Sequence, residues 1–116
     1  MRTHKDLNVW HKGMEIARFV HTATRSFPRD ELYGMTSQMR RAAYSIPSNI
    51  AEGAARRSSV ELRQFLYIAL GSVSELETQS ILSHDFGYLS DQDNSTLSEM
   101  LREEIKMLSA LIDKCN

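Results

Sequence analysis

The sequence contains few of the residues that crosslink a chain or interrupt regular structure. Its 116 residues include one cysteine, two prolines and five glycines. A single cysteine, Cys115, excludes a disulfide framework and a zinc site made of several cysteines. The N-terminus has no basic segment followed by an apolar one, and no run of about 18 apolar residues occurs. We therefore expect a cytoplasmic protein that does not associate with membranes.

Motifs for metal, phosphate or nucleophilic chemistry are also lacking. None of the four histidines belongs to a His-Glu-x-x-His motif or to a His/Cys cluster with metal spacing. A di-iron site in a helical bundle needs Glu-x-x-His pairs, and no histidine stands three residues after the candidate glutamates. Residues 51–55 lack the glycine spacing and the Lys-Ser/Thr pair of a phosphate-binding loop. We therefore expect no enzyme, no cofactor, no metal and no small-molecule substrate.

Charge is divided unequally between the two halves of the chain, although the formal net charge is only −1. Residues 1–58 carry ten basic and five acidic side chains, whereas residues 59–116 carry four basic and ten acidic ones. Such an asymmetry indicates either a nucleic-acid surface or a charge-matched contact between copies of the chain.

Apolar residues recur at steps of three and four in four segments, which predicts four amphipathic helices. In the third segment, Leu62, Leu66, Ala69, Val73 and Leu76 follow the heptad rhythm of a left-handed bundle. No alternating strand pattern interrupts the helical one, and the connections are short. We therefore expect an all-α, up-down antiparallel four-helix bundle, a single domain over 1–116, with helices at residues 8–26, 32–52, 59–85 and 91–115.

Specific residues define the expected core stripes and helix ends. Gly53 is expected to end the second helix in a left-handed conformation, and Pro47 to kink or open that helix without ending it. Ser58 and Ser90 are predicted to cap the third and fourth helices. The first helix is expected to bury Leu7, Trp10, Met14, Ala17, Val20 and Thr24, and the fourth to bury Leu97, Leu101, Ile105, Leu108, Ile112 and Cys115.

Two helical stretches, residues 42–51 and 64–74, carry no charged residue, which indicates that each helix is covered on two of its faces. Opposite their core stripes lie small or uncharged residues and one tyrosine on each helix, a composition that lets another backbone approach closely. We expect these residues to form a contact between copies, the alternative being that they point into water. The candidates are Ser37, Tyr44, Ser48 and Ala51 on the second helix, and Gln64, Tyr67, Gly71 and Thr78 on the third.

Arginines cluster in the second helix and just after it. An arginine fork donates two parallel hydrogen bonds to phosphate, so these residues are candidates for binding nucleic acid. The alternative is that the basic face of the first two helices docks on the acidic face of a neighbour's last two, a head-to-tail contact that closes into a ring. The candidate residues are Arg40, Arg41, Arg56, Arg57 and Arg63.

One long run carries a family resemblance. Residues 33–53, YGMTSQMRRAAYSIPSNIAEG, closely resemble the signature of the 23S rRNA-intervening-sequence protein family, also called four-helix bundle proteins. Further matches are residues 7–10 (LNVW), Phe27-Pro28, residues 65–72 (FLYIALGS) and residues 87–89 (GYL). The resemblance covers almost the whole chain.

This resemblance implies a bacterial four-helix bundle that assembles as a five-membered ring, without an established biochemical role. A similar bundle is the accessory variability determinant of diversity-generating retroelements, a basic ring that binds nucleic acid and partners a reverse transcriptase. We therefore expect a non-enzymatic homopentamer that binds RNA or nucleoprotein through its basic patches. The alternative is a protein-interaction scaffold whose basic patches pair with acidic helices of neighbouring subunits.

Overall fold

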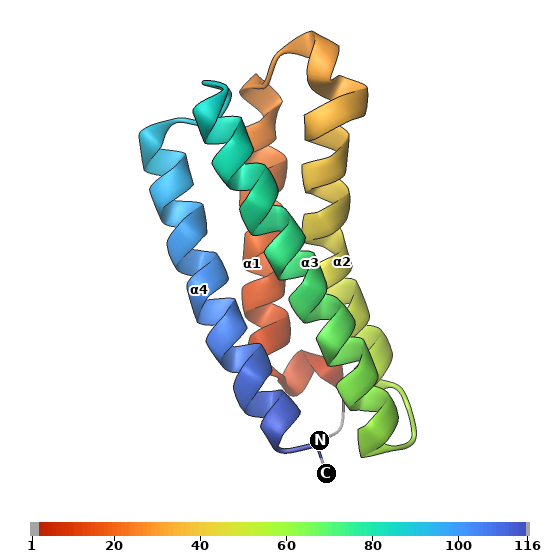
Figure 1. Cartoon of the computed structure of the whole chain (residues 1–116). Helices are drawn as coiled ribbons and strands as arrows, with labels where there is room; N and C mark the ends of the chain where they lie inside the picture. Colours follow the sequence, from red (N-terminus) through yellow and green to blue (C-terminus); the bar gives the residue numbers. More distant parts are fainter. Residues whose placement is uncertain (1–2, 116) are drawn as a thin grey trace.

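Four long helices make up most of the protein in the computed structural model, which describes residues 3–115 (Figure 1). They are α1 (Asn8–Ala23), α2 (Ser37–Ala54), α3 (Ser59–Asp85) and α4 (Asp91–Asp113). No strand occurs in this part of the chain. Residues 1, 2 and 116 of the expected domain lie outside the described residues. The fold class is therefore all-α, as the sequence predicted.

The helices share one core. Helix α2 packs on α1 and α3, and α4 also packs on α1 and α3, so each helix has two neighbours. The connections lie at alternating ends of an elongated body of 43 × 24 × 19 Å (Figure 1). Every helix contributes fully buried side chains, which makes the chain one compact domain; the largest apolar ones are Ile16, Met39, Ile46, Ile50, Leu66, Leu76, Leu97, Leu101 and Leu108.

Two of the predicted core stripes are confirmed only in part. In α1 the buried residues are Val9, Gly13, Ile16, Ala17 and Val20, while the predicted Leu7, Trp10 and Met14 are only half-buried. In α4 the predicted Leu97, Leu101, Leu108 and Ile112 are buried, but Glu104 is buried in place of the predicted Ile105, which is half-buried. Both helices carry apolar residues on two adjacent stripes, so periodicity alone does not select the inner one.

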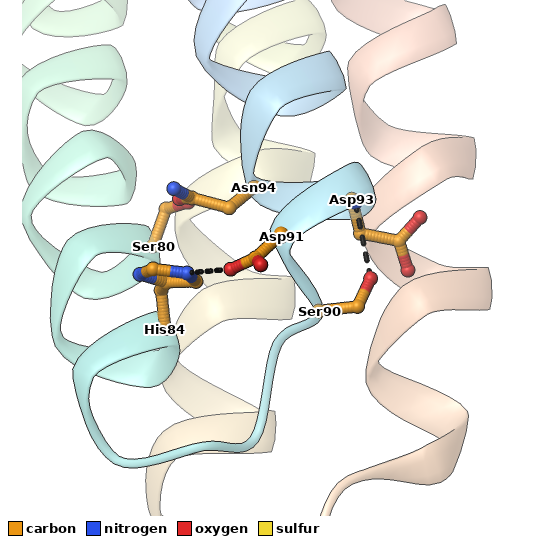
Figure 2. Close-up of polar contacts among 6 residues, drawn as sticks. All are labelled: Ser80, His84, Ser90, Asp91, Asp93 and Asn94. Atoms are coloured by element: carbon orange, nitrogen blue, oxygen red, sulfur yellow. Dashed lines mark hydrogen bonds and ion pairs between the residues drawn. The ribbon is translucent and has the colours of Figure 1, made fainter.

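The predicted serine caps are confirmed. The Ser58 hydroxyl oxygen accepts a hydrogen bond from the Glu61 N–H at 3.2 Å, at the start of α3. The Ser90 hydroxyl oxygen accepts from the Asp93 N–H at 3.1 Å, at the start of α4 (Figure 2). Each bond satisfies one of the N–H groups that have no partner inside the helix.

The connection from α3 to α4 is held by polar contacts between the two helices. His84 Nε2 lies 2.6 Å from Asp91 Oδ1 (Figure 2), and the Ser80 hydroxyl donates to Asn94 Oδ1 at 3.2 Å. Gly87 turns the chain here with a φ of 81°, which favours glycine. These contacts bring the last turns of α3 against the first turns of α4.

Helix α2 begins at Ser37, later than predicted, because residues Leu32–Thr36 form a wider π-helical turn. Gly34 breaks the helical dihedrals there with φ −114° and ψ −112°. The Glu31 carboxylate spans the break: it accepts from the Met35 N–H at 3.0 Å and from the Tyr88 hydroxyl at 2.9 Å. The Met35 bond, then the Tyr88 bond, lower the pKa of Glu31 below its usual 4.5.

The two special residues inside α2 behave differently from each other. The helix continues through Pro47 to Ala54, as predicted. The prediction for Gly53 is wrong: it lies inside the helix, is buried, and does not have a positive φ. A Cβ at Gly53 would lie 2.7 Å from Phe65 Cβ and 3.1 Å from Leu62 Cδ1 of α3. Glycine is required here by the close approach of α3 and not by the end of the helix.

Replacing Gly53 by alanine is therefore expected to destabilise the fold by about 1–3 kcal/mol, the usual cost of overpacking a core. Gly71→Ala is the matched control, since a Cβ at that mid-helix glycine meets no atom within 4 Å. The control is expected to stabilise the fold by about 0.5–1 kcal/mol, because alanine restricts the unfolded chain. Urea unfolding measures both, and equal effects would contradict the close approach.

The Glu31 contacts predict a dependence of stability on acidic pH. A carboxylate whose pKa is lowered in the folded state stabilises the fold above its unfolded pKa of about 4.5, and this contribution is lost as the pH falls through the folded value. Between about pH 5 and about pH 3, wild type should lose more free energy of unfolding than Glu31→Gln, which has no carboxylate to protonate. Identical pH profiles from urea titrations would show that these contacts do not contribute.

Candidate nucleic-acid interface

The five predicted arginines form two groups at opposite ends of the bundle. Arg40 and Arg41 lie in the first half of α2, close to the α1–α2 connection. Arg56 and Arg57 follow the end of α2, and Arg63 lies early in α3. The α1–α2 and α2–α3 connections are at opposite ends in Figure 1. One surface therefore does not contain all five.

Arg40 is bound within the fold. Its Nε donates to Thr24 Oγ1 at 2.9 Å, and its Nη2 donates to the His21 carbonyl at 3.2 Å. These acceptors lie in the last turn of α1 and just after it, where carbonyl groups have no helical partner and the dipole favours a cation. Arg40 thus joins the start of α2 to the end of α1.

The second group is also largely engaged. Arg56 forms an ion pair with Glu52 at 3.0 Å, and its guanidinium lies 4.9 Å above the Phe65 ring. Arg63 donates to the Cys115 carbonyl at 2.9 Å and so fastens the C-terminal end of the described chain to α3. Arg57 is exposed and makes no contact of this kind with residues 3–115. This end of the molecule therefore offers one unengaged arginine from the predicted set.

The structure adds three arginines that the sequence reasoning missed. Arg25 and Arg29 line a groove of about 230 Å³ together with Arg40. Arg41 lines an adjoining open groove of about 600 Å³ that also includes Arg40. Arg18 lines a third groove, which shares Tyr44 with the second. We call Arg18, Arg25, Arg29, Arg40 and Arg41 the arginine surface.

The arginine surface is positively charged on balance. Residues 18–41 contain its five arginines and two carboxylates, Asp30 and Glu31, and Glu31 is held by Met35 and Tyr88. All the arginines except Arg40 are exposed and have no hydrogen-bond or ion-pair partner within residues 3–115. One sequence signal could have indicated Arg25 and Arg29. They lie on either side of the Phe27-Pro28 turn, and this turn lies beside the end of α1.

Two tyrosines accompany these arginines. Tyr33, in the π-helical turn, is 93% exposed and lines the 600 Å³ groove. Tyr44 lines the same groove, and its hydroxyl shares a 2.8 Å hydrogen bond with His21 Nδ1. Exposed aromatic rings between cationic side chains are the arrangement on which bases of a single strand stack.

The predicted self-contact residues are all accessible except Ala51, which is half-buried. Ser37, Tyr44 and Ser48 line the 600 Å³ groove on α2, whereas Gln64, Tyr67, Gly71 and Thr78 are exposed along α3. The Ser48 hydroxyl donates to the Tyr44 carbonyl and the Thr78 hydroxyl to the Ser74 carbonyl, each within its own helix. These hydroxyls are thereby satisfied without a partner molecule.

Helix α3 exposes large apolar side chains that the sequence reasoning did not single out. They lie on the same helix as the predicted Tyr67, which is 56% exposed. Large apolar side chains gathered on one exposed helix are typical of an interaction surface. We call these side chains the apolar face of α3: Val60, Tyr67, Ile68, Ile81 and Leu82 in the helix, and Phe86 directly after its last residue.

Neither a metal centre nor a membrane span is found in the described part of the chain. Among residues 3–115, no group of three or more His, Cys, Asp or Glu side chains is placed to hold a metal ion. None of the helices described is both long and apolar enough to span a membrane.

Comparisons with known proteins concern the whole bundle. A crystal structure of a protein of unknown function from the S23 ribosomal protein family of Bacteroides thetaiotaomicron VPI-5482 superposes with a TM-score of 0.81. The two chains are 26% identical, over 90% of this chain and 97% of the other. No curated protein matches this chain. The sequence model described as 23S rRNA-intervening sequence protein matches residues 5–110, and the chain therefore belongs to that family.

Proposed function

We propose that this protein is a non-enzymatic, cytoplasmic, up-down antiparallel bundle that binds RNA through the arginine surface. The observation that carries this proposal is the set of arginines that have no hydrogen-bond or ion-pair partner among residues 3–115 and that line three adjoining grooves along α1, α2 and their connection. A guanidinium pairs with phosphate through two parallel hydrogen bonds, and binding gains free energy from counterion release. Membership of a family named for a 23S rRNA intervening sequence supports an RNA partner.

The exposed tyrosines favour single-stranded over duplex RNA. Tyr33 and Tyr44 line the same groove as Arg40 and Arg41, so a base that stacks on a ring would place its phosphates near guanidinium groups. Duplex RNA keeps its bases stacked inside and would use the arginines alone.

Arg29→Ala/Arg41→Ala tests the surface without disturbing described contacts inside the fold, since both side chains are exposed and neither has a hydrogen-bond or ion-pair partner in the described part of the chain. The affinity for a single-stranded RNA should fall, and the slope of log affinity against log salt should decrease by about 0.7 for each phosphate that the variant no longer binds. Fluorescence anisotropy at several salt concentrations measures both quantities.

Arg57→Ala/Arg102→Ala is the charge-matched control, because these two arginines are exposed but lie outside the arginine surface. It should retain most of the affinity. If both double variants lose the same affinity, binding depends on net charge and not on the arginine surface. If neither variant loses affinity, the arginine surface does not bind RNA.

A second function, as a self-assembling scaffold, rests on the apolar face of α3. A copy that covered this face would remove Tyr67, Ile68 and Leu82 from water, together with the small residues predicted to form the contact. The family resemblance makes a five-membered ring the expected assembly. The exposed carboxylates Glu75, Glu77 and Glu99 also offer a neighbour's arginines a docking partner, which is the charge-paired version of the scaffold.

Ile68→Glu is expected to disperse the assembly into 13.3 kDa monomers, because it places a charge in the apolar contact. Ser109→Glu, at an exposed position of α4, is the control that should leave the assembly intact. Light scattering measures the mass of both and of wild type. A monomeric wild type at micromolar concentration would contradict the scaffold proposal. High salt should dissociate an assembly held by charge pairs, whereas an assembly held by apolar contacts should persist.

A further inference from the structure

The side chain of Glu104 places a carboxyl group inside the core, and neither of the functions proposed above involves it. Its exposed fraction is zero, and neither carboxyl oxygen has a hydrogen-bond partner among the described residues. A buried, unpaired carboxylate is strongly unfavourable, so such a group either finds a partner or becomes neutral.

The surroundings of Glu104 are built by α1 and α2. The position that a Cβ on Gly13 would occupy lies 3.1 Å from Glu104 Oε2 and 3.4 Å from the Pro47 nitrogen. The absence of a side chain at Gly13 therefore leaves the space in which the carboxyl group from α4 approaches α2 near Pro47.

Pro47 creates the acceptor that a neutral carboxyl group requires. A residue at this position in a helix would normally donate its N–H to the carbonyl four residues earlier, that of Ala43, but proline has no N–H. Ala43 is fully buried, so water does not replace the missing donor. The Ala43 carbonyl therefore lacks its usual helical donor, and it lies one helical turn before Pro47, the residue that the Glu104 carboxyl group approaches at Gly13.

We propose that Glu104 is a protonated carboxylic acid in the folded protein and donates its hydrogen to the Ala43 carbonyl that Pro47 leaves free. One hydrogen bond would then satisfy both buried groups and would join α4 to α2 across the bundle. Folding is in this way coupled to the uptake of one proton.

The charges near Glu104 act in opposite directions, and burial outweighs them. Within residues 3–115 both charged side chains that act on it lie on α1: Lys12 lowers the pKa of Glu104 and Glu15 raises it, while no titratable group of α2 or α3 acts on it. Lys12 is already engaged, with its Nζ 3.0 Å from Glu103 Oε2 and 3.4 Å from Glu15 Oε2. Burial, the dominant cause, raises the pKa of Glu104 from 4.5 to about 8.

The sign of the resulting pH dependence follows from proton linkage. Between pH 4.5 and about 8 the unfolded chain has lost the proton that the folded chain retains, so stability decreases as the pH rises. The ratio of folded to unfolded protein should fall by up to about tenfold for each pH unit in this range, and the effect should level off above it.

The test compares wild type with Glu104→Gln, whose amide can donate to the same carbonyl but does not ionise in this range. The unfolding equilibrium of each is measured in urea from about pH 5 to about pH 9. The stability of wild type relative to Glu104→Gln should decrease as the pH rises. In parallel, the carbon-13 shift of the Glu104 carboxyl group in folded wild type should titrate near the upper end of that range.

Pro47→Ala tests the acceptor. Alanine restores an N–H that competes with Glu104 for the Ala43 carbonyl, so the neutral form of Glu104 is stabilised less and the carboxyl titration should move to lower pH. The proposal is overturned if the carboxyl group of wild type titrates near 4.5, or if Pro47→Ala leaves the titration unchanged. Because this measurement uses no RNA, its result is independent of the proposed function.

Discussion

The bundle depends on the close approach of α2 to its neighbours at two glycines. At Gly53 an added Cβ would lie 2.7 Å from Phe65 of α3, and at Gly13 of α1 it would lie 3.3 Å from the Ile46 side chain of α2. Helices whose backbones come this close leave little freedom in how they are positioned along one another. The approach at Gly13 also makes the space in which Glu104 is buried. The positions of the polar groups thus follow from the packing of the backbones.

The same packing separates arginines that hold the fold from arginines that are free to bind a ligand. Because α1 ends beside the start of α2, Arg40 reaches the Thr24 hydroxyl and the His21 carbonyl. Arg25 and Arg29 come to the same end of the bundle and have no side-chain partner among the residues that the structure describes. An arginine that already donates to carbonyl groups has fewer donors left for phosphate, so the unpaired arginines are the ones that carry the proposed function.

Much of the fold was predictable, but the candidate site only in part. Periodicity located the helices, and Ser58 and Ser90 marked the beginnings of α3 and α4, because these signals act within a few residues of the chain. The candidate arginines are those that lie densest along the sequence, and this density does not reveal their partners. The sequence therefore indicated Arg63, although its side chain donates a hydrogen bond to the Cys115 carbonyl. It did not indicate Arg29, although Arg29 is exposed.

The amino-acid sequence by itself determined the helical class, the number of helices, the caps and the absence of a disulfide framework, because each depends on local spacing or on residue type. The tertiary structure alone decided which stripe of α1 faces inward, why Gly53 is a glycine, and that Glu104 lies in the core. These features depend on side chains that are distant in the sequence. A carboxyl group between Leu101 and Leu108 can face water or the core, and only the packing against Gly13 and Pro47 decides between them.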